Sequence, residues 1–141
     1  MSVLKTSREI PARVEQVFTA ISDAERLAQW WGPAGFTNTF SVCEFVQDGR
    51  WELTMRGPDG KDYPNQSRFA EIDALRKVVI DHISAPQFQL TITLTETTAG
   101  TLVEWEQAFE SEEVARKIAQ FVGPANEQNL DRLTAEALRG N

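Results

Sequence analysis

A long stretch of alternating apolar and polar residues, from Phe36 to Phe109, limits what this chain can fold into more than any other feature. The clearest cases are Trp51–Met55 and Phe88–Leu94, where every second side chain is apolar. This period is typical of β-strands with one face buried and the other in water. Turn residues interrupt the alternation at Asp48-Gly49, Pro58-Asp59-Gly60, Ala85-Pro86 and Thr98-Ala99-Gly100. Because short turns join consecutive strands, the stretch predicts an antiparallel meander.

The alternation and the turns together predict the bounds of the strands, including one strand before this stretch. These strands cover Val3–Ile10, Phe36–Val42, Arg50–Arg56, Ser67–Ile72, Val78–Ile83, Phe88–Thr95 and Leu102–Phe109. In the last of them, Glu104 and Glu106 alternate with Trp105 and Gln107. We therefore expect the two carboxylates on the outer face of the sheet, and Gln107 on the inner face beside Trp105.

The last stretch, Gly123–Leu138, is the predicted centre of the fold. Its apolar residues recur at helical spacing and are Val122, Ala125, Leu130, Leu133 and Ala137. Pro124 suits a first helical position, and no helix breaker follows until Gly140. A helix of about four turns with so narrow an apolar stripe is marginal alone in water. It needs a broad apolar surface, so we expect the sheet to curve around it.

Two short helices are predicted between the first and second strands. Pro11 opens the first one. Its apolar stripe consists of Val14, Val17, Phe18 and Ile21. A capping box at Ser22-Asp23-Ala24-Glu25 begins the second, which runs to Trp30 or Trp31. Gly32-Pro33 then stops it.

A further helix is predicted after the last strand. Ser111 caps it, and it runs to about Phe121 before Gly123-Pro124 resets the chain into the final helix. The order of elements predicts an α+β fold class, with residues 1–141 in a single domain.

The composition restricts the partners and the compartment. A formal net charge of −7 and a pI of about 4.7 argue against nucleic acid and against an anionic membrane surface. Cys43 is the only cysteine, which excludes an intrachain disulfide and suits the reducing cytoplasm. No apolar run reaches membrane-spanning length, and Met1–Glu9 lacks the basic start and apolar block of a signal peptide. We therefore expect a cytoplasmic protein.

Several segments follow the order and spacing of a known family over nearly the whole chain. Those in the N-terminal helical region are Ile10–Phe18 and Asp23–Pro33, which ends in two tryptophans and a Gly-Pro pair. Those in the strands and the last helix are Asp48–Trp51, Phe69–Ile72, Val78–Ile80, Gly100–Val103 and Asn129–Leu133. Together they resemble the START-like SRPBCC superfamily, and within it the branch of heat-shock protein 90 ATPase activator homologues.

The resemblance implies a helix-grip fold, in which a curved antiparallel sheet wraps the C-terminal helix and leaves a cavity. Roles in the superfamily include binding lipids, sterols, polyketides or plant metabolites, cyclising polyketides, and assisting a chaperone. This chain differs from many relatives at Gly49-Arg50, where they have two glycines, and at Pro124-Ala125-Asn126, where they have an aromatic residue. We expect these differences to affect the pocket and not the fold.

The sequence offers little for catalysis or metal binding. With one histidine and one cysteine, no spacing of His, Cys or carboxylates supplies three or four metal ligands, so we expect neither a metal nor a cofactor. No Gly-x-Ser-x-Gly elbow and no phosphate-binding glycine loop is present. Cys43 is interpreted as a small apolar residue.

His82 is the only plausible acid or base at neutral pH. Its plainest interpretation is a hydrogen-bonded strand residue. It enters the predicted pocket if Val78 and Ile80 face the helix. The alternative register, with Val79 and Ile83 inward, sends it to solvent.

The inward-facing aromatic residues indicate a small-molecule site between the sheet and the last helix, because a narrow helix stripe against wide rings leaves space. We expect Trp30 and Trp31 to border its mouth, and His82 and Gln107 to be its polar anchors. The predicted apolar walls are Trp51, Met55, Phe88, Trp105 and Leu130. The plainer alternative is that the tryptophans simply fill the core.

The sequence leaves three functions open. The first is binding of a small hydrophobic or aromatic molecule in this cavity. The second, implied by the resemblance, is interaction with a chaperone as an ATPase activator. The third is a cyclase- or hydrolase-like enzyme that uses the cavity, with His82 as its acid or base. Homodimerisation through an exposed strand edge or the tryptophan-bearing loop also stays open.

Overall fold

The alternating residues form consecutive antiparallel strands, and the N-terminal strand completes a seven-stranded sheet. The computed structural model describes residues 2–139. The strands are β1 (Ser2–Ile10), β2 (Thr37–Cys43), β3 (Gly49–Arg56), β4 (Asp62–Asp73), β5 (Lys77–His82), β6 (Phe88–Glu96) and β7 (Thr101–Phe109). Their order across the sheet is β1-β7-β6-β5-β4-β3-β2. The predicted meander is therefore confirmed for β2 to β7, with β1 paired to β7.

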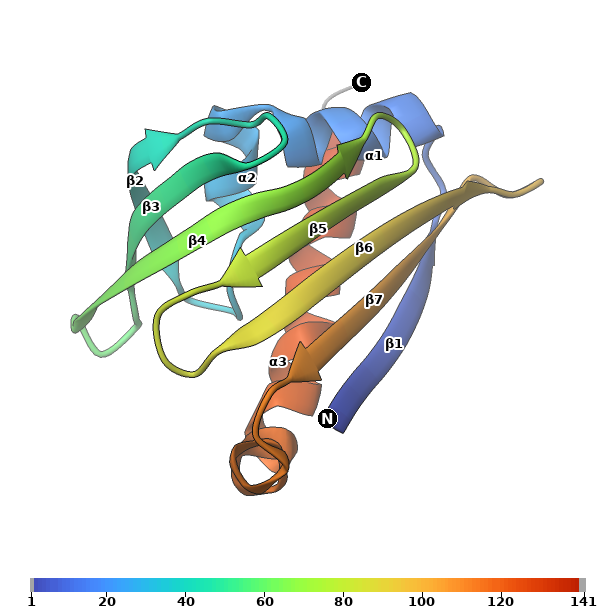
Figure 1. The fold of residues 1–141 in the computed structure, drawn as a ribbon. Helices are drawn as coiled ribbons and strands as arrows, with labels where there is room; N and C mark the ends of the chain where they lie inside the picture. Colours follow the sequence, from blue (N-terminus) through green and yellow to red (C-terminus); the bar gives the residue numbers. More distant parts are fainter. Residues whose placement is uncertain (1, 140–141) are drawn as a thin grey trace.

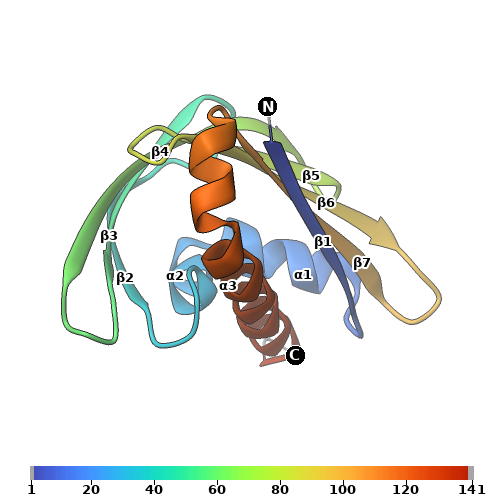
Figure 2. The same ribbon diagram turned by 90° about the horizontal axis from the view of Figure 1, so that it is seen from below.

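The sheet is strongly curved, and the C-terminal helix lies in its concavity (Figure 1). Figure 2 shows the strands as an arch over this helix. Two register shifts, between Phe40 and Val42 in β2 and between Phe69 and Glu71 in β4, indicate bulges that bend the strands. The predicted α+β arrangement of a curved sheet around the last helix is confirmed.

Helices α1 (Val14–Ser22) and α2 (Ala24–Trp30) cover one end of the arch (Figure 1). The start of α2 corrects the predicted capping box, because Asp23 and not Ser22 is the N-cap. The Asp23 carboxylate accepts a hydrogen bond from the Arg26 backbone N–H at 3.2 Å. Ser22 cannot take this role because it is the last residue of α1 and the chain becomes extended only at Asp23.

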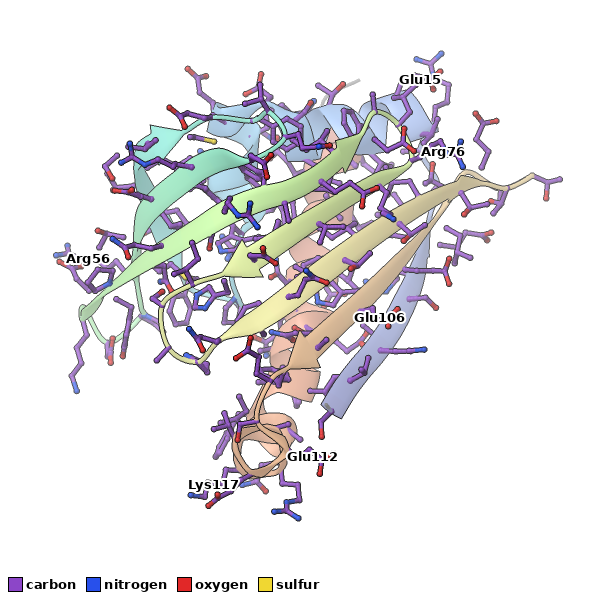
Figure 3. All side chains as sticks on the ribbon, in the orientation of Figure 1. Glu15, Arg56, Arg76, Glu106, Glu112 and Lys117 are labelled. Carbon is purple, nitrogen blue, oxygen red and sulfur yellow. The ribbon has the colours of Figure 1, made fainter. Side chains whose placement is uncertain are left out.

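The helix α3 (Glu112–Arg139) is continuous, so the predicted division into two helices at Gly123-Pro124 is wrong. Pro124 lies inside the helix and not at its first position. The helix changes direction along its length, and its first turns lie beyond the end of the sheet, where Figure 3 labels Glu112 and Lys117. A proline removes one backbone hydrogen bond and bends a helix without necessarily ending it. The predicted helix break at Gly140 lies outside the described residues.

The core lies between the concave face of the sheet and α3. Leu130 and Leu133 of α3 are buried against this face, as is Ile92 of β6. Glu104 and Glu106 are exposed on the outer face, as predicted, and Figure 3 labels Glu106 there. The sheet is thus apolar on the side that faces α3 and polar on the other.

Strand β4 is longer than predicted, since it begins at Asp62 and not at Ser67. The added residues include Pro64 and lack an apolar alternation, which makes them resemble a loop in the sequence. They nevertheless pair with β3, where Tyr63 lies opposite Met55 and Asn65 opposite Leu53. The extension brings Tyr63 and Asn65 to the space beside α3.

Candidate functional site

A cavity of about 440 Å³ lies between the concave face of the sheet and the middle of α3. Its walls come from the loop after α2, from β3 to β7 and their loops, and from α3. The lining residues are Trp31, Gly32, Pro33, Phe36, Met55, Asp62, Tyr63, Pro64, Asn65, His82, Ala85, Pro86, Phe88, Leu90, Trp105, Gln107, Asn126 and Asn129. Its volume falls in the range of about 300–1,000 Å³ that is usual for small-molecule pockets.

Many of the residues predicted as cavity walls do line this cavity. They are Trp31, Met55, His82, Phe88, Trp105 and Gln107. The remaining three, Trp30, Trp51 and Leu130, are no more than 1% exposed and lie in the core instead. A ligand-binding role for the lining residues stays a prediction.

The four tryptophans form one packed cluster around Trp31. Its ring centroid lies 5.8 Å from that of Trp30, 4.8 Å from that of Trp51 and 6.3 Å from that of Trp105. The four tryptophans therefore divide between the core and the cavity wall. Trp30 and Trp51 fill the core, while Trp31 and Trp105 also form cavity wall.

The strand register settles which way His82 faces. It lies on the concave side with Val78 and Ile80, whereas Ile83 is 48% exposed, so the alternative register is wrong. His82 pairs with Phe88 across β5 and β6. Their rings stack with centroids 4.4 Å apart and an interplanar angle of 6°. This cross-strand pair forms a flat section of the cavity wall.

Both ring nitrogens of His82 have protein partners. Nδ1 lies 2.9 Å from the Pro86 carbonyl oxygen, and Nε2 lies 2.6 Å from Asn65 Oδ1. Burial lowers the pKa of His82, and the hydrogen bond to Pro86 opposes this effect. Asn65 Nδ2 donates to the Tyr63 carbonyl at 2.9 Å, which keeps its Oδ1 facing the His82 ring, so both ring nitrogens face oxygen acceptors of the protein. This geometry gives no support to proton transfer between His82 and a bound molecule.

Two amide side chains form another polar section of the wall. Asn126 Nδ2 of α3 donates to Gln107 Oε1 of β7 at 3.1 Å. Gln107 is only 7% exposed. Within residues 2–139, Gln107 Nε2 and Asn126 Oδ1 have no hydrogen-bond partner. Asn129 differs, because it donates to the Trp30 carbonyl at 2.9 Å and accepts from the Gly32 N–H at 3.3 Å.

One arginine of α3 holds the loop after α2, which we call the 31–36 loop. Arg132 donates to five backbone carbonyl oxygens at 2.8–3.2 Å, those of Gln29, Trp31, Gly32, Pro33 and Phe36. Burial lowers the pKa of Arg132, but a guanidinium keeps its proton at any physiological pH. Since this loop supplies part of the cavity wall, α3 fixes the position of that wall.

The 31–36 loop has two further constraints. Gln128 Oε1 of α3 accepts a hydrogen bond from the Ala34 N–H at 3.1 Å. Gly32 has a φ of +92°, and a Cβ at this position would lie 2.7 Å from Met55 Cε. Only glycine adopts this backbone conformation readily, so the turn against the cavity depends on it.

The sequence analysis did not identify the contributions of Asn126, Asn129 and Arg132, because only the apolar residues of the last helix were expected to face the sheet. A signal was present. Asn126 and Asn129 each precede a leucine by four residues, Leu130 and Leu133 respectively, which places all of them near one helix face. Asn65 was missed because the predicted β4 began too late.

Two other hollows have a different character. They measure about 460 and 570 Å³ and lie near the turns at Gly100 and Leu75. Neither is lined by an aromatic side chain. Among residues 2–139, no group of three or more His, Cys, Asp or Glu residues is placed to hold a metal ion. In the same residues, no helix combines the length and the apolar character needed to cross a bilayer.

A curved antiparallel sheet around a long C-terminal helix, with a cavity between them, defines a helix-grip protein of the START-like SRPBCC superfamily. The model of one of its families, the Activator of Hsp90 ATPase homolog 1-like proteins, matches residues 11–137. The chain belongs to this family.

Solved structures of bacterial proteins share the fold. A protein of Nitrosomonas europaea is 16% identical, with a TM-score of 0.88 over 99% of this chain and 96% of its own. A protein of Arthrobacter aurescens is 24% identical, with a TM-score of 0.88 over 97% of this chain and 86% of its own. The AHSA1-like protein of Aeromonas hydrophila is 18% identical, with a TM-score of 0.78 over 99% and 94%. No curated protein matches the sequence significantly.

Proposed function

We propose that this protein binds a small, largely apolar molecule in the cavity between the sheet and α3. The observation that carries the proposal is the cavity itself, about 440 Å³ lined by aromatic side chains from the sheet and from the 31–36 loop. Protein interiors are close-packed, with few voids larger than a water molecule. A hollow of this size beside a packed tryptophan cluster therefore suggests a site for a ligand.

The gain from binding is large enough for a useful affinity. Burial of apolar surface contributes about 25 cal/mol per Å². A ligand that loses about 150 Å² of apolar surface to the walls gains about 4 kcal/mol before the cost of association. Stacking against Trp31, Trp105 or Phe88 adds to this gain when the ligand has a ring.

Binding of N-phenyl-1-naphthylamine, a neutral fluorescent probe, tests the proposal. We expect its emission to rise on addition of the protein and the melting temperature of the protein to increase with probe concentration. Isothermal calorimetry then gives the affinity without reliance on tryptophan emission. Absence of binding by this probe and by a panel of neutral aromatic compounds would contradict the proposal.

A pair of variants at one wall position locates the bound probe. Met55 lines the cavity and is only partly buried, so its replacement disturbs the core little. Met55→Trp fills part of the cavity, and we expect at least about a tenfold loss of affinity. Met55→Leu keeps the volume and should bind like the unaltered protein. Equal affinity in both variants would place the probe elsewhere.

A second candidate function is interaction with the chaperone Hsp90, and the description of the matched family favours it. The test is the ATPase rate of the host's Hsp90 with and without this protein, together with a pull-down. An unchanged rate would contradict an activator role. We place either function in the cytoplasm, which suits a chain with one cysteine.

A further inference from the structure

We infer that the ligand of this cavity is uncharged and carries an adjacent hydrogen-bond donor and acceptor, as a carboxamide, lactam or imide on a ring does. The inference rests on the proposed binding function and specifies its ligand class. Two independent observations support it, namely the charges around the cavity and the unused hydrogen-bonding groups of its wall.

The walls offer no counter-ion for a charged ligand. No Lys or Arg of the described residues lines the cavity. Asp62 is the one lining carboxylate in that part of the chain, and Arg56 already pairs with it at 2.9 Å. The guanidinium of Arg132 is directed at five backbone carbonyls, four in the 31–36 loop and one in α2. A carboxylate or phosphate in this site would therefore give up its hydration without a cation to replace it.

Most polar side chains of the wall are occupied within the protein. The Asn129 amide is used on the Trp30 carbonyl and the Gly32 N–H. His82 and Asn65 bind each other, and each also binds a nearby carbonyl group. The Asn126–Gln107 pair is different, because one hydrogen bond leaves each amide half used. Gln107 keeps its Nε2 donor and Asn126 its Oδ1 acceptor, and both residues line the cavity.

The pattern left by this pair does not depend on how the two amides are turned. If both amides are reversed, Gln107 donates to Asn126, and the unused groups are then the acceptor of Gln107 and the donor of Asn126. Gln107 is only 7% exposed and lines the cavity with Asn126, so the unused amide groups are reached from the cavity, and a ligand that displaces water there must replace the hydrogen bonds of that water. A ligand amide satisfies the donor and the acceptor together. A ketone offers one acceptor, and a carboxylate offers only acceptors and brings a charge.

Three compounds with one ring system separate these cases, and calorimetry at neutral pH measures their affinities. They are 2-naphthamide, 2-acetylnaphthalene and 2-naphthoate. We expect the amide to bind roughly tenfold tighter than the ketone, because it makes one more hydrogen bond in a buried setting. We expect the carboxylate to bind more weakly than the ketone by at least about tenfold.

Gln107→Met removes the amide and keeps the length of the side chain. We expect this variant to bind the amide and the ketone within about twofold of each other, with the ketone affinity near that of the unaltered protein. If Gln107→Met does not fold, Asn126→Ala makes the same comparison, and the three affinities of the unaltered protein decide the question alone.

The outcomes distinguish the inference from the function on which it rests. Equal binding of amide and ketone, or binding of 2-naphthoate as tight as that of 2-naphthamide, would overturn the inference alone. The same holds if N-phenyl-1-naphthylamine binds and 2-naphthamide does not. If neither that probe nor any of the three compounds binds, the binding function fails, and the inference fails with it.

Discussion

The two ends of the space between the sheet and α3 differ in how they are filled. At the end covered by α1 and α2, which we call the filled end, Leu130 and Leu133 meet Trp30 and Trp51, and all four are no more than 1% exposed. At the other end, the hollow end, α3 presents Asn126 and Asn129, and about 440 Å³ stays open. The same helix and the same strands thus make a core in one place and a cavity in the other.

The difference shows that the chemistry of the inner face of α3 changes along its length. A leucine packs against any apolar neighbour, whereas a buried asparagine must satisfy its polar atoms and packs only where partners exist. Asn129 has partners at the end of α2 and on the 31–36 loop, and Asn126 has one on Gln107. The change from asparagine to leucine therefore separates the part of the fold suited to binding from the part that stabilises it.

The largest expected effect is at the filled end. Leu130→Ala should lower the free energy of unfolding by about 4 kcal/mol, because the surrounding core collapses only partly around the lost side chain. Denaturation by urea measures this loss. Asn126→Ala at the hollow end should cost less than about 1 kcal/mol, since it removes one hydrogen bond beside an open space. Similar losses in the two variants would show that the ends do not differ in stability.

The next effect concerns the link between α3 and the 31–36 loop. Arg132→Met removes five hydrogen bonds to carbonyl oxygens, of which those of Trp31 and Pro33 keep a second donor. We expect a loss on the order of 3 kcal/mol in urea denaturation. Arg116→Met is the matched control, because Arg116 is exposed on the first turns of the same helix. That variant should change stability by less than about 0.5 kcal/mol. A loss in the control as large as in Arg132→Met would contradict a specific role for Arg132.

A smaller effect distinguishes two tryptophans of the cluster. The Trp30 Nε1–H donates to the Ala20 carbonyl at 2.8 Å, whereas the Trp105 Nε1–H is buried with no partner among the described residues. Replacement by phenylalanine removes the same volume at both positions. We expect Trp30→Phe to cost about 1 kcal/mol more than Trp105→Phe, because only Trp30 loses a hydrogen bond. Thermal denaturation measures the difference, and the reverse order would be inconsistent with this bonding pattern.

The smallest effect is a pH dependence at the hollow end. Burial lowers the pKa of His82 in the folded protein, and the unfolded value is about 6.5. As the pH falls below about 7, the unfolded chain therefore takes up the proton first, and stability decreases. The contribution of neutral His82 to the free energy of unfolding is thus complete above about pH 7 and is lost on acidification. His82→Phe should show a smaller decrease in melting temperature between about pH 7.5 and about pH 6, where carboxylates titrate little. An identical decrease in both proteins would refute the assignment to His82.

The arrangement of the sheet could be predicted from the sequence because the alternation of apolar residues is a local signal. It gave the meander, the curved sheet around the last helix and the inward face of β7 with Trp105 and Gln107. The bounds of the last helix could not be predicted in the same way. Pro124 is tolerated inside α3 because the helix continues as a bend, and no local rule decides between a bend and a break.

The cavity itself was harder to predict than the sheet. Which of two adjacent tryptophans lines it depends on the end of α2 at Trp30, after which Trp31 turns toward the open space. The inward direction of Asn126 and Asn129 depends on the rotation of α3, which only packing against the sheet fixes. The sequence therefore predicted a cavity between the two layers but only part of its wall.

The hold of Arg132 on the 31–36 loop has a consequence for adaptation. The guanidinium donates hydrogen bonds to main-chain oxygens of the loop. The path of the loop therefore does not depend on the side chains of the loop, apart from the need for glycine at position 32, where φ is +92°. We therefore expect that Pro33 and Phe36, which line the cavity, can be replaced without a change in the path of the loop. Swapping them offers a direct way to redesign what this protein accepts, for example in a biosensor, without rebuilding its architecture.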